Sequence, residues 1–356
     1  MAYKTLLHNA ILGLFPWIGP ESLGGAQLSG RLAWEGVQDG CSTLFCYAPG
    51  VEAQHTKSLP NAHVAFTQAQ AVRLALSKTW QPELVLIWHM SLLRLFPFFR
   101  IRSASVVLFL HGIEVWRRLD LLTRLLLPRV NLFVSNSNYT WQRFLDFHPD
   151  LTAKPQQTVY LGVDTPIDTP STEPSDPPAV LIVSRLACGE DYKGHRELIN
   201  AWPLVLQHIP NAELWIAGDG DLRPVLEQRV AARGLTQHIR FFGRISEEQK
   251  QDLLIRCRCF AMPSRGEGFG LVYLEAMRLG RPCLVSDCDA GREVVNPPEA
   301  GLAVNPDDPQ TLAIALIRLL TPGNEWSQWS IQARRRYESQ FTARHFQERL
   351  VDALAR

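Results

Sequence analysis

Short apolar runs alternate with amphipathic helical patterns along almost the whole chain. Neighbouring parallel strands cannot be joined by a tight turn and need a crossover, which is usually a helix. A chain that repeats strand and helix many times therefore predicts parallel sheets with helices on both faces. At 356 residues the chain exceeds the length that one hydrophobic core usually supports, so we expect two domains.

The same alternation occurs on both sides of a proline-rich stretch. Residues 165–178 hold five prolines and few apolar side chains, which predicts a linker or a surface loop. The expected strands are 5–14, 42–47, 62–67, 83–89, 105–111 and 131–137, then 179–184, 212–217, 239–243, 259–263, 282–286 and 302–304. The expected helices are 26–37, 68–78, 116–127 and 138–147, then 194–208, 222–233, 247–257 and 309–320, with a polar helical tail at 325–356. Two doubly wound sheets would face each other across a cleft, with ligands beyond the carboxyl ends of the strands.

The overall composition argues against several functional classes. A formal net charge of +1 is unlike that of a dedicated nucleic-acid binder, which usually carries a strongly basic face. The first ten residues lack the apolar core and cleavage site of a signal peptide, and no run is apolar enough to span a membrane. The seven cysteines have no zinc spacing, so we interpret them as buried thiols. We therefore expect a protein of the reducing cytoplasm.

A glycine loop between a strand and a helix is the strongest candidate for a site. Residues 263–277 read PSRGEGFGLVYLEAM, and they follow an apolar run that predicts a strand. Their three glycines allow close backbone approach, and the helix that begins near Leu271 would offer free N–H groups to a phosphate. Glu267 and Glu275 could accept hydrogen bonds from hydroxyls, which favours a phosphorylated sugar or a nucleotide sugar. Two alternatives stay open, namely surface glutamates and the general acid and base of a hydrolase.

Three further groups of residues lie in segments that follow expected strands. Arg185 and Lys193 could bind phosphate oxygens, or they could be solvated surface charges. Gly24-Gly25 precedes a helix and could admit a phosphate, although double glycines are common in loops. His111 could hydrogen bond a sugar hydroxyl or steady charge at a reacting centre, or it could be structural.

Three other stretches are interpreted more plainly. Asp219-Gly220-Asp221 and Asp287-Cys288-Asp289 resemble acidic metal pairs, but loops after strands are rich in Asp, and we expect no metal at either. Residues 91–102 mix apolar bulk with arginines and predict a buried connecting helix that ends at Pro97. The alternative for them is a weak peripheral membrane contact in which the arginines meet anionic lipid.

Taken together, these motifs resemble the retaining glycosyltransferases of the GT-B fold, family 4. The strongest part is Glu267-Gly-Phe-Gly-Leu-Val-Tyr-Leu-Glu275-Ala-Met, which is similar to the paired-glutamate motif of the family. The segments Ser184-Arg185-Leu186 and Tyr192-Lys193-Gly194-His195 are similar to its phosphate-binding region. Other matching blocks are Gly24-Gly25-Ala26-Gln27, His111-Gly112-Ile113-Glu114, Val134-Ser135-Asn136-Ser137, Gly162-Val163-Asp164 and Ala217-Gly218-Asp219-Gly220. The resemblance implies an α/β chain of two Rossmann-like doubly wound domains, residues 1–165 and 178–340, with the helix at 341–356 packing back on the first domain.

The resemblance also implies a role for each matching position. Arg185 and Lys193 would bind the donor diphosphate, and Gly25 would lie against it. Glu275 would bind the ribose hydroxyls. The positions implied for donor binding are Gly25, Arg185, Lys193, Ile245, Lys250, Gly268, Phe269, Gly270, Leu271 and Glu275, and those implied for catalysis are His111 and Glu267. Asp219 and Asp289 would lie in ordinary loops, and no metal or other cofactor would be required. The chain departs from the family pattern at Asp289-Ala290-Gly291, where a double glycine is common, and in the extra residues Cys188-Gly189-Glu190-Asp191.

The implied activity is transfer of a hexose from a UDP-sugar or GDP-mannose to a hydroxyl of a saccharide or lipid-linked acceptor. The linkage formed would be α. The enzyme would take part in polysaccharide or glycoconjugate synthesis in the cytoplasm. With a lipid-linked acceptor, it would work at the inner face of the cytoplasmic membrane. A sugar-nucleotide epimerase on the same fold and an inactive nucleotide-sugar-binding protein are the alternatives. No pyridoxal phosphate motif supports a phosphorylase.

Overall fold

The computed structural model describes residues 10–19, 24–51, 59, 62–164, 174 and 176–355. Most of the expected linker at 165–178 and the first part of the strand expected at 5–14 lie outside the described residues. The chain divides into two compact units. Unit 1 comprises Met1–Gly162 and Ala343–Arg356, and unit 2 comprises Val163–Thr342. We expected the corresponding boundaries at 1–165 with 341–356, and at 178–340.

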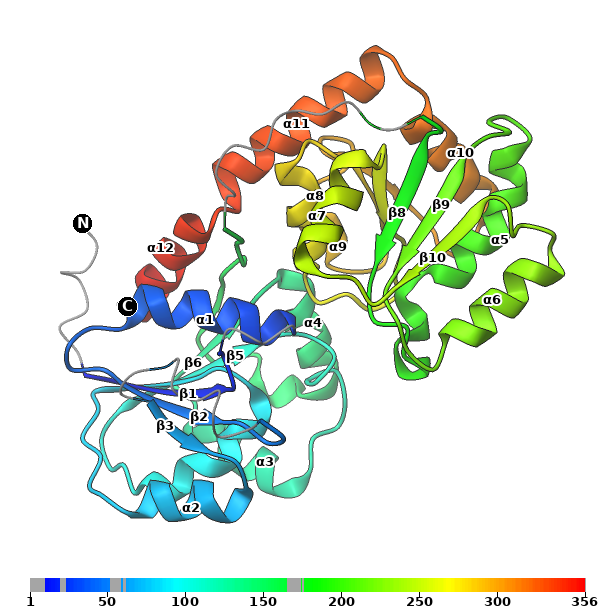
Figure 1. Ribbon diagram of the computed structural model, residues 1–356. Coiled ribbons are helices and arrows are strands. Elements are labelled where there is room, and N and C mark those ends of the chain that lie inside the picture. Colours follow the sequence, from blue (N-terminus) through cyan, green and yellow to red (C-terminus); the bar gives the residue numbers. More distant parts are fainter. Residues whose placement is uncertain are drawn as a thin grey trace. The chain divides into compact units, whose positions relative to one another are not determined.

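Unit 1 is a parallel sheet with helices on both faces, in the strand order β3-β2-β1-β4-β5-β6-β7 (Figure 1). Its strands are β1 (Ile11–Pro16), β2 (Thr43–Tyr47), β3 (Ala62–Ala65), β4 (Leu84–Ile87), β5 (Ser105–Leu110), β6 (Leu132–Ser135) and β7 (Gln156–Thr158). Its helices are α1 (Gly25–Val37), α2 (Gln68–Leu76), α3 (Leu121–Leu126), α4 (Asn138–Phe147) and α12 (Ala343–Leu354), with short 3₁₀ helices η2 (Met90–Phe99), η3 (Leu127–Arg129) and η4 (Pro149–Leu151).

Unit 2 repeats this plan with the strand order β10-β9-β8-β11-β12-β13, again all parallel. Its strands are β8 (Ala179–Val183), β9 (Glu213–Ala217), β10 (Ile239–Gly243), β11 (Cys259–Met262), β12 (Cys283–Ser286) and β13 (Gly301–Val304). Its helices are η5 (Cys188–Lys193), α5 (His195–Leu206), α6 (Arg223–Ala232), α7 (Glu247–Arg256), α8 (Leu271–Arg278), α9 (Gly291–Val295), α10 (Pro309–Leu320) and α11 (Asn324–Gln340).

The inner strands are buried on both faces, which is why they read as continuous apolar runs in the sequence. All four residues of β4, β11 and β12 are buried.

Several helices begin where a polar side chain caps free N–H groups. The Ser137 hydroxyl accepts from the Thr140 N–H at 3.0 Å, and the Ser246 hydroxyl accepts from the Gln249 N–H at 3.2 Å. The expected fold class is confirmed.

Each sheet has one place where the strand order reverses. In unit 1 the chain builds β1, β2 and β3 outward and then returns to place β4 beside β1. In unit 2 it builds β8, β9 and β10 outward and returns to place β11 beside β8. The crossovers leave in opposite directions at these points, so loops part and leave room for a ligand at the carboxyl ends of the strands.

The last helix of the chain completes unit 1. The expected tail is divided into α11 and α12 by Phe341 and Thr342, and Thr342 pairs with Val163 in an isolated parallel bridge. α12 packs on α1, where the Gln347 amide donates a hydrogen bond to the Leu32 carbonyl at 2.9 Å (Figure 1). Unit 1 is therefore built from two separate stretches of the sequence.

Several local expectations are wrong. The helix expected at 116–127 begins only at Leu121, because the Asp120 carboxylate caps it by accepting from the Thr123 N–H at 3.1 Å. The helix expected to end at Pro97 continues to Phe99, as a 3₁₀ helix whose last turn closes from the Arg100 N–H to the Pro97 carbonyl. The polar edge strand β7 was not expected. Of the cysteines, four are buried, and the exposed ones are Cys41, Cys188 and Cys288.

Candidate functional site

The candidate residues of unit 2 gather at the reversal point of its sheet. Arg185 follows β8, the glycine loop 263–270 follows β11, and Asp289 follows β12. Because β8, β11 and β12 are neighbours in one parallel sheet, their carboxyl ends lie along one edge. The sheet order therefore brings together segments that are about 80 and 100 residues apart in the sequence.

Glycine is required where the loop turns into α8. Gly270 caps this helix with φ of +89°, and a Cβ at this position would come within 2.4 Å of the Tyr273 ring. The Tyr273 hydroxyl in turn donates to the Met262 carbonyl at 2.8 Å, which ties the helix to the end of β11. Phe269 is buried, so the loop has an apolar anchor immediately before the helix. Gly268 directly precedes Phe269, and Leu271 is the first residue of α8, so both lie in the backbone segment that these contacts hold in place.

A second glycine brings the Lys193 segment against the loop. Gly194 has φ of +94°, and a Cβ there would lie 2.7 Å from the Pro263 carbonyl oxygen. Next to this contact, the Arg265 N–H donates to the Tyr192 carbonyl at 2.9 Å. The end of η5 and the start of the glycine loop therefore form one packed layer.

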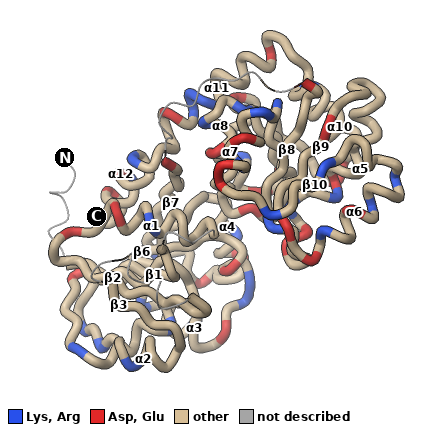
Figure 2. The backbone as a smooth tube through the Cα atoms, in the orientation of Figure 1, with Lys and Arg blue, Asp and Glu red and all other residues tan. Residues whose placement is uncertain are grey.

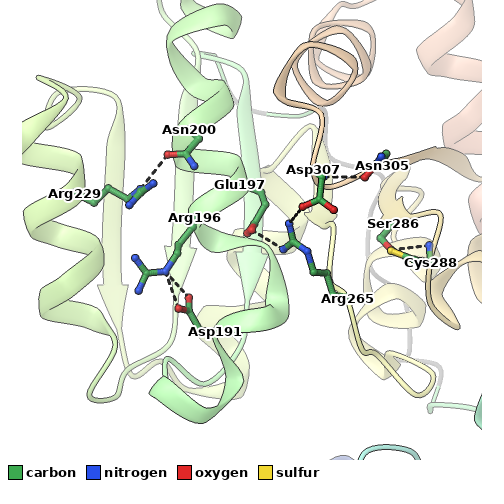
Figure 3. Close-up of polar contacts among 10 residues, drawn as sticks. All are labelled: Asp191, Arg196, Glu197, Asn200, Arg229, Arg265, Ser286, Cys288, Asn305 and Asp307. Atoms are coloured by element: carbon green, nitrogen blue, oxygen red, sulfur yellow. Dashed lines mark hydrogen bonds and ion pairs between the residues drawn. The ribbon is translucent and has the colours of Figure 1, made fainter. Parts of the chain in front are cut away.

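The Arg265 side chain fastens this layer to its surroundings. Its guanidinium donates to Glu197 at 2.6 Å and to Asp307 at 2.5 Å, so it joins α5 to the turn before α10 (Figure 3). Close by, Arg196 binds both carboxylate oxygens of Asp191 at 2.8 and 2.7 Å (Figure 3). Both contacts come from one nitrogen, Arg196 Nε, and this charge-assisted hydrogen bond ties the start of α5 to η5.

Both expected phosphate-binding cations are paired with one carboxylate, Glu190. One oxygen of Glu190 binds the Arg185 guanidinium, and the other lies 3.1 Å from the Lys193 ammonium. The Arg185 side chain is 80% exposed, whereas those of Lys193 and Glu190 are 17% and 16% exposed. Two cations on a single carboxylate form the charge pattern that a phosphate group would also satisfy.

Glu267 is the second carboxylate of this cluster. Burial raises its pKa, while the nearby Lys193 charge and hydrogen bonds from the Phe269 and Gly268 N–H groups lower it in part. The negative charge of Glu190 also raises the pKa of Glu267. Two carboxylates, Glu190 and Glu267, therefore lie near the single ammonium of Lys193. Gly268 and Phe269 lie in the loop before α8, so the Glu267 carboxyl is held by amides of its own loop and not by those of the helix start.

Asp289 is buried and organises the loop, so the expectation of an ordinary loop residue is wrong. It is 3% exposed. One of its oxygens accepts from the Ser264 hydroxyl and from the Glu267 N–H at 3.0 Å, and the other accepts from the Gly291 N–H at 2.9 Å. Burial raises the pKa of Asp289 to about 7 against the opposing effect of these donors. This carboxyl joins the loops after β11 and β12.

Glu275 and Lys250 form a largely enclosed ion pair. The Lys250 ammonium lies 2.9 Å from Glu275 and 2.8 Å from Glu247, and the Lys250 and Glu275 side chains are each 14% exposed. Lys250 lies on α7 and Glu275 on α8, and Ile245 lies half-buried just before α7. The structure therefore brings Lys250, one of the positions implied for donor binding, against Glu275, which we expected at the ribose.

The candidates of unit 1 lie among aromatic rings. His111 follows β5, its Nε2 lies 2.6 Å from the Trp88 carbonyl, and its ring is 4.8 Å from that of Phe109. Since a carbonyl only accepts, Nε2 carries the proton and Nδ1 is the acceptor nitrogen. Burial lowers the pKa of His111 to about 4, with Glu114 acting in the opposite direction. The ring is therefore neutral at pH 7.

Two other positions complete the edge of unit 1. Gly25 begins α1 and is exposed, and Gly24 before it donates to the Gln27 side chain at 2.9 Å. His89 follows β4 and stacks on His111 with ring centroids 6.2 Å apart. Sequence reasoning missed His89, although a histidine directly after an apolar run is the same signal that singled out His111.

The structure gives no support to the two acidic patterns as metal sites. Among the described residues, no group of three or more His, Cys, Asp or Glu side chains is arranged to hold a metal ion. The Asp221 carboxylate accepts from the Cys188 N–H at 2.7 Å, and Asp219 accepts from the Gly220 N–H at 2.9 Å. Asp219 therefore stabilises its own turn, and Asp221 ties the loop after β9 to the start of η5.

The arrangement in unit 2 can bind an anion and hydroxyl groups side by side. Arg185, Lys193 and the start of α8 supply positive charge and N–H donors, and Glu267 and Glu275 supply acceptors. Each charge-assisted hydrogen bond contributes about 1.5–3 kcal/mol when its partner is well placed. The chemistry suits a sugar that carries a diphosphate.

Comparisons with known proteins agree with this chemistry. The sequence model of the family Glycosyl transferases group 1 matches residues 177–322. The chain is 30% identical over 279 residues to a GDP-mannose-dependent monoacylated alpha-(1-6)-phosphatidylinositol monomannoside mannosyltransferase of Corynebacterium glutamicum, covering 71% of this chain and 70% of the relative. It is 37% identical over 132 residues to the phosphatidyl-myo-inositol mannosyltransferase of Mycobacterium leprae, which is 37% of this chain and 34% of that relative. The chain thus spans about a third of the length of the mycobacterial relatives that it matches.

The fold has a counterpart among solved structures. The crystal structure of the HepE protein of Anabaena in complex with UDP and glucose superposes with a TM-score of 0.75 at 19% identity, covering 98% of this chain and 99% of that one. At such low identity the likeness concerns the fold, which is the two-domain GT-B arrangement. The strand order, the motifs and the corynebacterial match together show that the chain belongs to the group 1 glycosyltransferases, family 4, of the GT-B fold.

Proposed function

We propose that this chain transfers a hexose from a nucleoside diphosphate sugar to a hydroxyl of a saccharide or lipid-linked acceptor and keeps the α configuration. The observation that carries the proposal is the convergence of Arg185, Lys193 and Glu267 at the reversal point of the unit 2 sheet. A GDP-mannose-dependent relative and a fold neighbour in complex with UDP and glucose support this class of donor.

The donor would bind to unit 2 through groups that now bind one another. The diphosphate would take the place of the Glu190 carboxylate between Arg185 and Lys193. The Glu275 carboxylate would accept from the ribose hydroxyls, and Glu267 would hold hydroxyls of the transferred hexose.

The reaction would break the bond between the anomeric carbon and the diphosphate oxygen and form a bond from that carbon to the acceptor oxygen. The acceptor proton would pass to the departing phosphate on the same face of the sugar. Lys193 and Arg185 would stabilise the negative charge that grows on this phosphate. Glu267 is held by the amides of its own loop, so holding hydroxyls suits it better than attacking the sugar. We propose that transfer needs no metal, and full activity in the presence of EDTA is the expected result.

The test is transfer from UDP- and GDP-hexoses, followed as acceptor-dependent release of nucleoside diphosphate. Lys193→Ala and Glu267→Ala should each lower the rate about 10³-fold while the circular dichroism spectrum and the melting temperature stay near those of the parent. Arg233→Ala, at an exposed position after α6, is the matched control. Full transfer activity in either site variant would refute the site.

Product analysis also separates the alternative activities. An epimerase would convert the donor without any acceptor, and an inactive binding protein would bind nucleotide without turnover. The anomeric proton coupling of the product in an NMR spectrum reports whether the linkage is α.

A further inference from the structure

Helix α3 of unit 1 exposes leucines that an ordinary surface helix would bury. Leu121, Leu122 and Leu125 are 71%, 54% and 66% exposed, although α3 is only six residues long. They are spaced three and four residues apart, so Leu125 lies on the same side of the helix as the other two. The buried residues of α3 are Thr123 and Leu126. An apolar face turned to solvent in this way indicates a surface that binds something.

The surroundings of this face are strongly basic. Residues 94–129 contain seven arginines, no lysine and two acidic residues, a formal net charge of +5 in a chain whose total is +1. Figure 2 shows basic residues along the chain beside α3. The arginines in and beside α3 are Arg117, Arg118, Arg124 and Arg129, and all four are exposed. Leucines and exposed arginines therefore share one short stretch of surface.

The stretch is anchored to the core of unit 1. The Arg94 guanidinium donates to the Thr123 hydroxyl at 3.0 Å and pairs with Asp120, so η2 and α3 lie side by side. The apolar side chains of η2 that we considered for a membrane contact are mostly buried, among them Leu93, Phe96 and Phe99. η2 thus serves as the support beneath α3, and the exposed apolar surface belongs to α3.

We propose that the α3 face, defined by Leu121, Leu122 and Leu125 with these four arginines, docks unit 1 on an anionic lipid bilayer. Leucines would enter the boundary between headgroups and acyl chains, and arginines would meet lipid phosphates. Three leucines on six residues are too small an area for a stable protein interface, which needs about 800 Å² on each partner. A nucleic acid would use the arginines but would leave the leucines in water.

The position of the face also bears on the acceptor. The chain runs from the end of β5 through His111 to α3 within ten residues, so the lipid surface would adjoin the carboxyl edge of the unit 1 sheet. This step rests on the proposed function, and it names the acceptor as one carried by a membrane. None of the helices in the described part of the chain has the length and apolar character needed to cross a membrane.

The experiment is flotation of the full chain with vesicles of phosphatidylcholine alone or with 30% phosphatidylglycerol. The parent should float with the anionic vesicles, and the bound fraction should fall at high salt. Leu121→Gln/Leu125→Gln and Arg117→Gln/Arg118→Gln should each weaken binding at least tenfold. Ile314→Gln/Ile331→Gln, which removes two exposed apolar side chains of unit 2, and Arg233→Gln/Arg335→Gln are the matched controls and should float like the parent.

Three results would overturn the proposal. They are a parent that stays with neither vesicle at low salt, a leucine variant that floats as well as the parent, and a leucine-dependent dimer in light scattering with no flotation. Nucleotide affinity of the same proteins is measured separately by calorimetry. A chain that floats but binds no UDP- or GDP-sugar would refute the proposed function and leave the lipid face intact. A chain that binds a UDP- or GDP-sugar but does not float would refute the lipid face and leave the proposed function intact.

Discussion

The carboxyl edge of the unit 2 sheet is lined by ion pairs, whereas the matching edge of unit 1 is lined by aromatic rings and a neutral histidine. In unit 2, each expected donor-binding charge already has a partner, as Lys193 has Glu190 and Glu275 has Lys250. In unit 1, His111 rests against Trp88 and Phe109, and burial lowers its pKa to about 4. A site for a charged ligand must keep its charges stable while the ligand is absent, and internal pairing does this. A site for uncharged hydroxyls has no such requirement.

The largest expected effect breaks the charged edge. Lys250→Met leaves the Glu275 carboxylate largely enclosed without its cation, so the free energy of unfolding should fall by about 2–4 kcal/mol and nucleotide binding should be lost. Lys250→Met/Glu275→Gln removes both charges and should regain most of the stability without regaining nucleotide affinity. Denaturant titration and calorimetry measure the two quantities. Equal stability of the single and double variants would contradict the pairing.

His111→Ala tests the neutral edge. Transfer should fall about 100-fold, while the affinity of the protein for a nucleoside diphosphate should change less than twofold. Because the pKa of His111 is lowered to about 4, the parent rate should show no ionisation of this residue near pH 6.5. Steady-state kinetics from pH 5.5 to 8 check both points, with the exposed His208→Ala as control. A variant that loses nucleotide affinity would place His111 with the charged edge instead.

Asp289→Asn examines the carboxyl that joins two loops. An amide offers one acceptor oxygen in place of two, so one of the N–H groups of Glu267 and Gly291 loses its partner, and transfer at pH 8 should fall about tenfold. The raised pKa of Asp289, about 7, means that the folded state binds its proton more tightly than the unfolded state. The Asp289 contribution to the free energy of unfolding therefore decreases as the pH rises from 4 through 7.

The contributions of His111 and His195 to the free energy of unfolding change with pH in the opposite direction to that of Asp289. Comparing the parent with Asp289→Asn isolates the Asp289 contribution, because both proteins keep the two histidines. Burial lowers the pKa of both histidines to about 4, so their contribution increases as the pH rises from 4 to 6.5. The difference in unfolding free energy between parent and Asp289→Asn should shift steadily against the parent from pH 5 to pH 7.5. A difference that does not depend on pH would show that Asp289 titrates normally.

The smallest expected effect sharpens the comparison. Glu190→Gln frees Arg185 and Lys193 from a competing carboxylate, so a nucleoside diphosphate should bind up to about fivefold more tightly. Glu197→Gln removes a carboxylate of the same edge that pairs with Arg265, and it should not tighten binding. Calorimetry with UDP and GDP gives the result. Weaker binding in Glu190→Gln would mean that Glu190 positions the two cations.

The sequence predicted most of the fold because buried parallel strands are apolar on both sides. The sequence did not predict β7, because its residues Gln-Gln-Thr lie at the sheet edge and have no apolar pattern. The start of α3 could have been predicted, because Asp120 and Thr123 have the spacing of a helix cap. The break at Phe341 could not, because it depends on the pairing of Thr342 with a residue 179 positions earlier.

For the candidate site, the sequence indicated which residues face a ligand but not what they contact without one. Glu190 was visible only as part of an insertion, and its pairing with Arg185 and Lys193 depends on the fold of η5. In the sequence, Asp289 looks like any other aspartate in a loop after a strand. Its burial follows from the adjacency of β11 and β12, which strand periodicity alone does not reveal.

The return of α12 to unit 1 has a consequence for how the protein is made. Unit 2 is an insertion within the sequence of unit 1, since residues 163–342 separate the first stretch of unit 1 from its last helix. A ribosome releases the first 162 residues long before α12, so the apolar face of α1 must wait through the synthesis of an entire domain. Phe346 and Leu350, which are fully buried in the finished unit, are made only after the whole of unit 2. A nascent chain halted near residue 342 would therefore be the form most in need of a chaperone.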